Sequence, residues 1–145
     1  MKETKMLKKV VNAIVIQKDR LLVTRIREGD WWTLPRGRVQ EGESDETAIR
    51  REIKEELPNI TILKLIPYKE FLGITPHSKV GIAVNTFFTD IEGSIEPGAE
   101  LTGSKWANLI LLKKLNLTTI AKDIVETLKN DGYFKNKCLF SCNRK

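Results

Sequence analysis

The segment that decides the fold is residues 37–59, which read GRVQEGESDETAIRREIKEELPN. We expect a helix to begin near Ser44, because serine is a good N-cap and the acidic residues after it suit the helix dipole. Glu52 and Glu56 then lie one turn apart on one face, and Glu55 flanks them. Like charges at this spacing weaken a helix by roughly 0.2–0.5 kcal/mol per pair. Such a cluster suits Mg²⁺, which binds carboxylates and shares its coordination shell with substrate phosphates.

A tight loop carrying Gly37, Gly42 and Glu43 should precede this helix, which we expect to span residues 44–57. The apolar residues of the helix recur at helical spacing, so they should form its buried face. That face should consist of Ala48, Ile49, Ile53 and Leu57.

The same segment resembles the Nudix box, a motif written Gly-x5-Glu-x7-Arg-Glu-U-x-Glu-Glu-x-Gly-U, in which U is apolar. The matching positions are Gly37, Glu43, Arg51, Glu52, Ile53, Glu55 and Glu56. Two positions depart from the motif, since Pro58 replaces the family Gly and Asn59 replaces an apolar residue. Pro58 disfavours helical backbone at Leu57, and asparagine tolerates the left-handed region. We therefore expect the helix end to be rebuilt by these residues rather than lost.

The resemblance implies hydrolysis of a nucleoside diphosphate linked to another moiety, by attack of water on phosphorus. It implies Mg²⁺ as the cofactor, with Mn²⁺ as an alternative. The implied metal ligands are the carbonyl of Gly37 and the carboxylates of Glu52, Glu55 and Glu56. Glu43 would orient Arg51, and Arg51 would orient the carboxylates; Arg51 and Glu55 form an i, i+4 pair that can assist. Neither Glu43 nor Arg51 needs to touch the metal.

The general base is a separate question, because relatives in the family use either a box glutamate or a glutamate from a distant loop. Glu100 is the loop candidate, because its spacing to Trp106 is similar to that of the family. Glu96 and Glu70 are weaker candidates, and an exposed loop carboxylate is the alternative interpretation of Glu100.

Four residues are candidates for substrate binding. Arg36 and Arg38 can meet phosphate oxygens, because a guanidinium suits bidentate phosphate contacts. Trp31 and Trp32 are adjacent, so in a strand one can pack in the core while the other offers a stacking face to a base. The alternatives are plain surface positions for the arginines and either core packing or simple exposure for both tryptophans.

The remaining pattern predicts strands and a second helix. Apolar or β-branched runs favour strands at 9–17, 21–26, 31–34, 60–72 (bent at Pro67), 80–91 and 100–109, with a turn at 18–20. Polar or glycine-rich loops are expected at 27–30, 75–78 and 92–99. Residues 117–131 have helical apolar spacing, and Gly132 should stop that helix. This order indicates a mixed α/β or α+β domain, and the resemblance implies the α/β/α sandwich of the Nudix family.

Length and composition place limits on the function. The 145 residues, 41% hydrophobic and 30% charged, suit one globular domain spanning 1–145. No apolar run reaches the ~20 residues of a membrane span, and the first residues lack the apolar stretch of a signal peptide, so we expect a cytoplasmic protein. Cys138 and Cys142 are then expected to be reduced thiols.

The net charge of +6 is concentrated at the ends of the chain. Residues 1–9 hold four lysines and one glutamate, and residues 135–145 hold three lysines and one arginine. A basic tail can attract nucleic acid or polyphosphate, although a solubilising end is the simpler interpretation.

Several functions remain open at this point. The first is a Mg²⁺-dependent pyrophosphohydrolase acting on a nucleoside triphosphate or an ADP-ribose-type nucleotide, as a monomer or homodimer. The segment Leu34-Pro35-Arg36-Gly37 resembles one seen in dinucleoside polyphosphate hydrolases, and Pro76 weakly resembles an ADP-ribose signature. RNA cap removal is a further enzymatic possibility. A non-catalytic nucleotide- or RNA-binding module is the alternative class, but such a module would be expected to lose the box carboxylates.

Overall fold

The computed structural model describes residues 8–26, 30–74, 80–93, 95 and 101–135. Eight strands and three helices are found in these residues. In chain order they are β1 (Lys8–Ile14), β2 (Ile16–Gln17), β3 (Arg20–Ile26), β4 (Trp32–Thr33), β5 (Arg36–Arg38), α1 (Asp45–Glu56), β6 (Ile60–Ile74), β7 (Gly81–Gly93), β8 (Leu101–Ala107), α2 (Leu109–Lys114) and α3 (Thr119–Asn130).

The strands form two sheets. The first is a mixed sheet in the order β5-β1-β7-β6, in which β1 and β7 are parallel and the outer pairs are antiparallel. The second is antiparallel, with β3 pairing with β2 and β4 as well as with β8. β5 is an edge strand of the mixed sheet. A ligand bound at this edge would therefore be next to both faces of the sheet.

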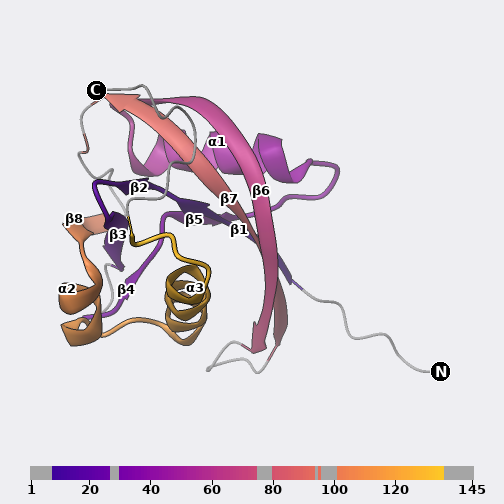
Figure 1. Cartoon of the computed structure of the whole chain (residues 1–145). Coiled ribbons are helices and arrows are strands. Elements are labelled where there is room, and N and C mark those ends of the chain that lie inside the picture. Colours follow the sequence, from indigo (N-terminus) through magenta and orange to yellow (C-terminus); the bar gives the residue numbers. More distant parts are fainter. Residues whose placement is uncertain (1–7, 27–29, 75–79, 94, 96–100, 136–145) are drawn as a thin grey trace.

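The alternation of side chains along β1 divides the core into two layers. Val11, Ala13 and Val15 pack in one cluster with the buried face of α1, whereas Ile14 packs in the other with α3. Neighbouring strand residues point to opposite faces of a sheet, so the two clusters lie on its two sides. Figure 1 shows α1 and α3 on opposite sides of β1 and β5. The predicted α/β/α arrangement is therefore confirmed.

The helix that carries the glutamates has the predicted ends. Ser44 caps it by accepting a hydrogen bond from the Thr47 N–H at 3.1 Å. Leu57 leaves the helical region, with φ −132° and ψ 74°, while its N–H still bonds the Ile53 carbonyl. Pro58 therefore ends the helix as expected, because its ring excludes helical backbone at the residue before it. Asn59 does not use the left-handed region, so that part of the expectation was wrong.

One correction concerns the loop before α1. Gly37 was expected in a loop, but it lies in β5, opposite Val11 of β1. Only three residues long, β5 has exposed arginines on either side of the glycine, so no apolar alternation marked it as a strand. Its tertiary pairing with β1 creates it.

A second correction concerns the segment after β8. The strand expected over 100–109 ends at Ala107, and Asn108 caps a short helix, α2, that was not predicted. At six residues, α2 is too short for helical periodicity to be recognised. The C-terminal helix was predicted correctly, and Gly132 stops it with φ 87°.

The strands predicted at 21–26, 31–34, 60–72 and 80–91 are confirmed with small shifts of their ends. The single strand predicted over 9–17 is instead divided at Val15 into β1 and β2, which belong to different sheets. The turn at Lys18 and Asp19 is tight, with both residues at positive φ. β6 shifts register at Pro67, as the proline predicted. In the described part of the chain, no helix is both long and apolar enough to cross a membrane. Several expectations lie outside the described residues, namely the loops at 27–29, 75–78 and most of 92–99, Pro76, Glu96, Glu100, Cys138, Cys142 and most of the basic ends.

Candidate active site

Arg51 joins three parts of the candidate site. Its Nε and Nη2 donate to the two carboxylate oxygens of Glu43, at 2.7 and 2.9 Å. Nη1 donates to Glu52 Oε2 at 2.6 Å, and Nη2 also donates to the carbonyl of Arg38 at 2.9 Å. The guanidinium therefore ties the loop, α1 and β5 together, as its rigid fork of donors allows. Sequence reasoning had paired Arg51 with Glu55 as well, but its ion pairs run to Glu43 and Glu52 instead.

The Glu43 carboxylate is held in its charged form. The Arg51 guanidinium, and after it the backbone N–H of Gln40, lower the pKa of Glu43 from 4.5 to about 2. In turn, the hydrogen bonds from Arg51 to Glu43 and Glu52 raise the pKa of Arg51. Glu43 is thus a charged anchor for Arg51 rather than a group that exchanges protons near neutral pH.

Gly37 packs directly against the side chain of Glu52. A Cβ placed on Gly37 would lie 1.8 Å from Cγ of Glu52, far inside contact distance. Only glycine lets β5 and α1 approach this closely, so the backbone of Gly37 and the carboxylate of Glu52 are brought together. This explains in physical terms why the segment begins with glycine.

Glu56 and Glu55 differ in their surroundings. Glu56 is half-buried, and its Oε1 accepts a long hydrogen bond, 3.4 Å, from the backbone N–H of Arg36. Glu55 is exposed on α1. Among the described residues, no three acidic, histidine or cysteine side chains are close enough to form a metal site by themselves.

The residues present nevertheless fit a divalent ion. The oxygen-only donor set is the kind that Mg²⁺ and Mn²⁺ bind, and Mg²⁺ commonly uses only one or two carboxylates, with water and substrate phosphate completing its shell. The missing side chain of Gly37 leaves its backbone directly beside Glu52. A site of this kind is completed by substrate rather than enclosed by protein.

The two arginines of β5 point away from α1. Gly37 faces α1, so Arg36 and Arg38, its neighbours in the strand, face the opposite side of the sheet. Their partners across the sheet are Asn12 and Val10 of β1. The arginines are exposed, as a phosphate- or base-binding role requires, but they do not lie against the box carboxylates.

Sequence reasoning missed Asn12. Its side chain is 1% exposed, and in the described structure its Oδ1 is the buried side-chain atom without a hydrogen-bond partner. Leaving such an acceptor unsatisfied costs roughly 1–3 kcal/mol. The signal was present as an asparagine inside the otherwise apolar run 9–17, where a buried polar residue needs a reason.

The adjacent tryptophans divide as the alternation predicted. Trp32 is buried in the core cluster with α3, and its ring is flanked by Lys105 Nζ, 4.7 Å from the ring centroid, and by Arg25. Trp31 is 47% exposed. Of the two, Trp31 is the one with a free face for stacking.

Of the candidate general bases outside the box, only Glu70 lies in the described residues. It is exposed on β6, opposite Asn85 of β7, whose amide donates to Asp45 at the start of α1 at 2.6 Å.

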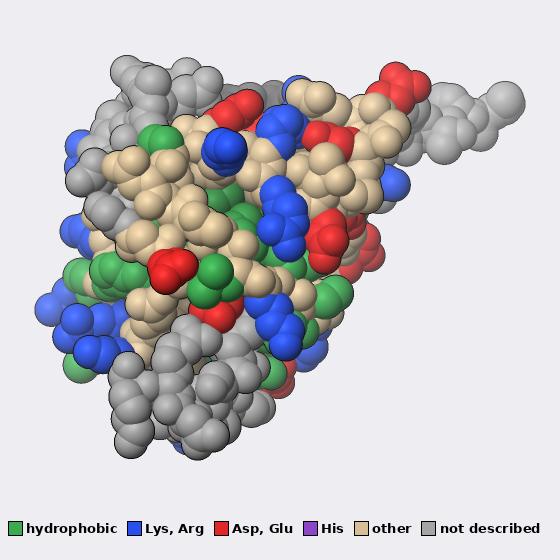
Figure 2. Space-filling model, turned by 90° about the horizontal axis from the view of Figure 1, so that it is seen from above, with side chains coloured by type: hydrophobic (Ala, Val, Ile, Leu, Met, Phe, Trp, Pro, Cys, Tyr) green, Lys and Arg blue, Asp and Glu red, His purple; other side chains and the backbone are tan. Residues whose placement is uncertain are grey.

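The side of the molecule that carries α1 shows acidic and basic side chains intermixed over its described residues (Figure 2).

Comparison with known proteins agrees with this geometry. The sequence model of the NUDIX domain matches residues 6–128. Among curated proteins, no sequence matches the chain.

Solved structures of similar fold include a NUDIX hydrolase from Nitrosomonas europaea, at 18% identity and a TM-score of 0.73, covering 87% of this chain and 90% of that one. A mutator MutT protein from Bacillus halodurans is 25% identical with a TM-score of 0.69, covering 83% of this chain and 80% of that one. A bifunctional NMN adenylyltransferase/ADP-ribose pyrophosphatase from Francisella tularensis, in complex with AMP and a manganese ion, is 20% identical with a TM-score of 0.67. The match covers 88% of this chain and 42% of that longer one.

The chain therefore belongs to the Nudix family, as the box motif indicated. Membership of this family confirms the predicted enzyme class, a Nudix hydrolase.

Proposed function

We propose that the protein is a Mg²⁺-dependent pyrophosphohydrolase that cleaves a nucleoside diphosphate linked to another moiety. The observation that carries the proposal is the assembly of Gly37, Arg51 and Glu52. Glycine packing brings the Glu52 carboxylate against the backbone of β5, and Arg51 holds its orientation through Glu43. A non-catalytic binding module has no need for this arrangement.

Glu52 and Glu56 would be the main ligands of the metal, with the Gly37 carbonyl and Glu55 completing the protein's share. When bound, a divalent ion neutralises phosphoryl oxygens and lowers the pKa of a coordinated water. The chain's own contribution is to position these oxygens: Arg51 holds Glu52, and the Arg36 backbone N–H meets Glu56. Mn²⁺ can replace Mg²⁺, because both prefer oxygen ligands.

The substrate would lie across the edge of the sheet at β5. Its diphosphate would meet the α1 side, next to Glu52 and Glu56. The nucleoside would lie on the other side of β5, where Arg36, Arg38 and the unsatisfied amide of Asn12 are found. On that side Arg36 and Arg38 would present guanidinium donors to the nucleoside, and Asn12 would supply a directed polar contact.

Trp31 is the proposed stacking residue, because its ring is exposed and that of Trp32 is not. For the general base we retain Glu100, and Glu70 is the alternative because it lies on β6 opposite Asn85, next to the start of α1. In either case the glutamate would remove a proton from the attacking water.

The proposed substrate is a nucleoside triphosphate or an ADP-ribose-type nucleotide, and the proposed location is the cytoplasm. The ADP-ribose pyrophosphatase among the structures of similar fold supports the second of these substrate types. We propose a single catalytic domain, acting as a monomer or homodimer, with nucleic acid binding through the basic ends as a secondary possibility.

Phosphate release from a panel of nucleotides in millimolar Mg²⁺, with added pyrophosphatase and phosphatase, tests the proposal. The panel holds nucleoside triphosphates, their oxidised forms, ADP-ribose and dinucleoside polyphosphates. Glu56→Gln should lower kcat at least about 100-fold, since the metal contributes several kcal/mol to the transition state. The matched control is Glu46→Gln, an exposed glutamate of the same helix, which should keep full activity.

One preferred substrate, turned over by the wild type and by Glu46→Gln but not by Glu56→Gln, would support both the function and the ligand assignment. Full activity in Glu56→Gln would contradict that assignment. No turnover of any nucleotide would contradict the proposed reaction and favour a non-catalytic nucleotide- or RNA-binding module, and a binding screen would then separate these two kinds of ligand.

A further inference from the structure

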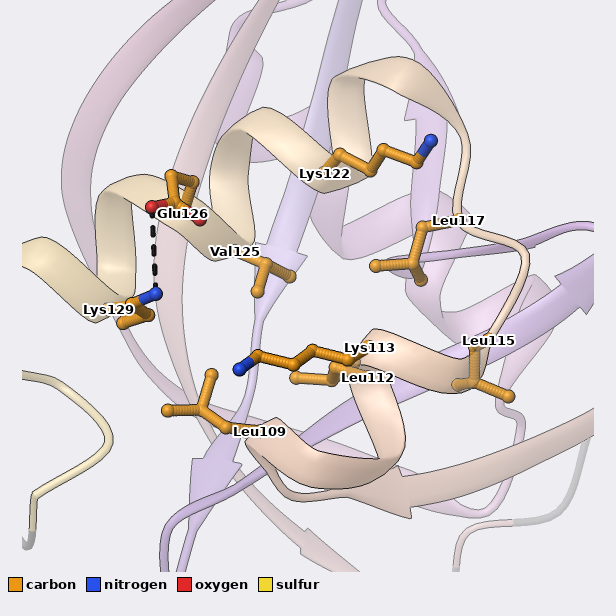
Figure 3. Close-up of a pocket in the computed structure, with 9 residues that line it drawn as sticks. All are labelled: Leu109, Leu112, Lys113, Leu115, Leu117, Lys122, Val125, Glu126 and Lys129. Atoms are coloured by element: carbon orange, nitrogen blue, oxygen red, sulfur yellow. Dashed lines mark ion pairs between the residues drawn. The ribbon is translucent and has the colours of Figure 1, made fainter.

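A cavity of about 270 Å³ lies between α2 and α3, away from β5 and α1. Its apolar lining comes from both helices and from the segment that joins them, namely Leu109, Leu112, Leu115, Leu117 and Val125. Figure 3 shows Val125 of α3 and Leu112 of α2 pointing into the space between the helices. Leu112, Leu117 and Val125 also belong to the core, so the cavity is an opening of the core to the surface.

The polar residues that line the cavity are mostly positively charged. They are Lys113, Lys122, Lys129 and Glu126. Lys129 is paired with Glu126 at 3.7 Å (Figure 3). Lys113 and Lys122 have no ion pair within the residues that the structure describes. The cavity therefore combines an apolar floor with two cations whose charge is not compensated.

This combination favours a ligand with an apolar body and an anionic end. An apolar floor provides the main driving force for burial. The two lysines are exposed, so solvent screens their attraction for a negative group and each adds a modest electrostatic contribution to binding. The volume lies just below the usual range of small-molecule sites, so a small ligand fits and a large one does not.

The chain's own ends are unsuitable occupants. Residues 1–7 and 136–145 contain five lysine or arginine residues and one acidic residue, Glu3. Such segments would bring positive charge to a cavity whose charged lining residues are already mostly lysines. An external ligand of opposite charge meets the electrostatic requirement better.

We propose that the cavity between α2 and α3 binds a small anionic amphiphile, a molecule with a carboxylate or phosphate group on an alkyl or aryl body. Leu112, Leu117 and Val125 contact the apolar body, and the positive charges of Lys113 and Lys122, on two sides of the opening, attract the anionic group (Figure 3). None of these residues belongs to the proposed catalytic machinery, so this site is separate from the nucleotide site.

The test uses octanoate as the probe, titrated to millimolar concentration against the full ¹⁵N-labelled chain without metal or nucleotide. Backbone amide shifts at Leu112, Leu117 and Val125 should follow a saturable binding curve. Octylammonium, which has the same body and the opposite charge, should cause no saturable shift at these residues. Octyl phosphate, tested in parallel, distinguishes a phosphate from a carboxylate preference.

Lys113→Glu combined with Lys122→Glu should raise the Kd of octanoate about tenfold or more, because two attractive charges become repulsive. The matched control is Lys114→Glu, which changes an exposed lysine of α2 outside the cavity lining and should leave the Kd within about twofold. If the double reversal prevents folding, Lys113→Gln combined with Lys122→Gln replaces it, with a smaller increase in Kd expected.

Four outcomes would each overturn the proposal. They are equal binding of octylammonium, an unchanged Kd in the charge variants, saturable shifts confined to other regions, and no binding of any anionic probe. Because binding is measured without substrate, none of these outcomes depends on whether the nucleotide hydrolase proposal is correct.

Discussion

Gly37 of β5 and Glu52 of α1 pack so closely that any side chain at position 37 would overlap that of Glu52. The position of a Gly37 Cβ would fall 1.8 Å from Glu52 Cγ and 2.4 Å from its Cβ and Cδ. Glycine is therefore required at position 37 because β5 and α1 approach each other closely there, and not because the backbone adopts a conformation that other residues avoid.

Gly37→Ala should lower kcat by roughly 10–100-fold, because a displacement of about 1 Å in a catalytic group can cost this much. The Cβ of Glu52 also lies only 2.4 Å from the position of the new methyl group, so side-chain rotation does not remove the overlap and β5 and α1 must move apart. The melting temperature should therefore fall as well as the activity. Steady-state kinetics and thermal unfolding check the two effects. The control is Gly103→Ala, whose Cβ would meet nothing closer than 3.7 Å. Wild-type kcat in Gly37→Ala would contradict the role of this contact.

Arg51→Lys should reduce kcat about tenfold or more while keeping the charge. A lysine ammonium cannot hold Glu43 through two parallel bonds while also reaching Glu52 and the Arg38 carbonyl. The matched control is Arg50→Lys, an exposed neighbour on α1. If Arg51→Lys raised only KM, with kcat unchanged, the proposed orientation of Glu52 by Arg51 would be wrong.

The stability of the protein should depend on Glu43 at low pH. Because the pKa of Glu43 is about 2 in the folded chain and ordinarily 4.5, the unfolded chain takes up this proton at higher pH. The stabilising contribution is therefore fully present above about pH 4.5 and is lost as the pH falls through about 2. Urea unfolding of the wild type and of Glu43→Gln should show a stability difference that shrinks over this window. A difference that stays constant would contradict the lowered pKa.

Asn12→Leu should raise the free energy of unfolding by about 1 kcal/mol, because it replaces a buried acceptor without a partner by an apolar side chain of similar size. It should also raise KM for the preferred nucleotide more than it lowers kcat, if the amide contacts the nucleoside. Urea unfolding and steady-state kinetics measure the two effects.

The matched control for Asn12→Leu is Thr86→Val on the neighbouring strand. The Thr86 hydroxyl donates to the Lys69 carbonyl at 2.7 Å and accepts from the Lys69 N–H at 3.1 Å. Its loss should therefore destabilise the fold by roughly 1–3 kcal/mol. Destabilisation by Asn12→Leu as well would show that the Asn12 amide has a structural partner and would remove the argument for a substrate contact.

The local sequence was sufficient to predict the elements that rely on short-range patterns. Ser44 and Pro58 bound α1 because capping and proline sterics act within a few residues. The spacing of apolar residues predicted α1, α3 and the long strands β6 and β7, since each has one or two faces to bury. The spacing of the box residues was also enough to identify the family and the enzyme class.

Other features were decided only by the tertiary structure, because they depend on residues that are distant in the sequence. β5 exists because Gly37 can pair with Val11, and α2 is too short to have a period of its own. The choice of Glu52 over Glu55 as the partner of Arg51 depends on where Glu43 places the guanidinium. Likewise, the isolation of the Asn12 amide and the lysine-rimmed cavity arise from the packing of strands and helices against one another. The sequence by itself determined which residues are able to act; three-dimensional packing decided which of them meet.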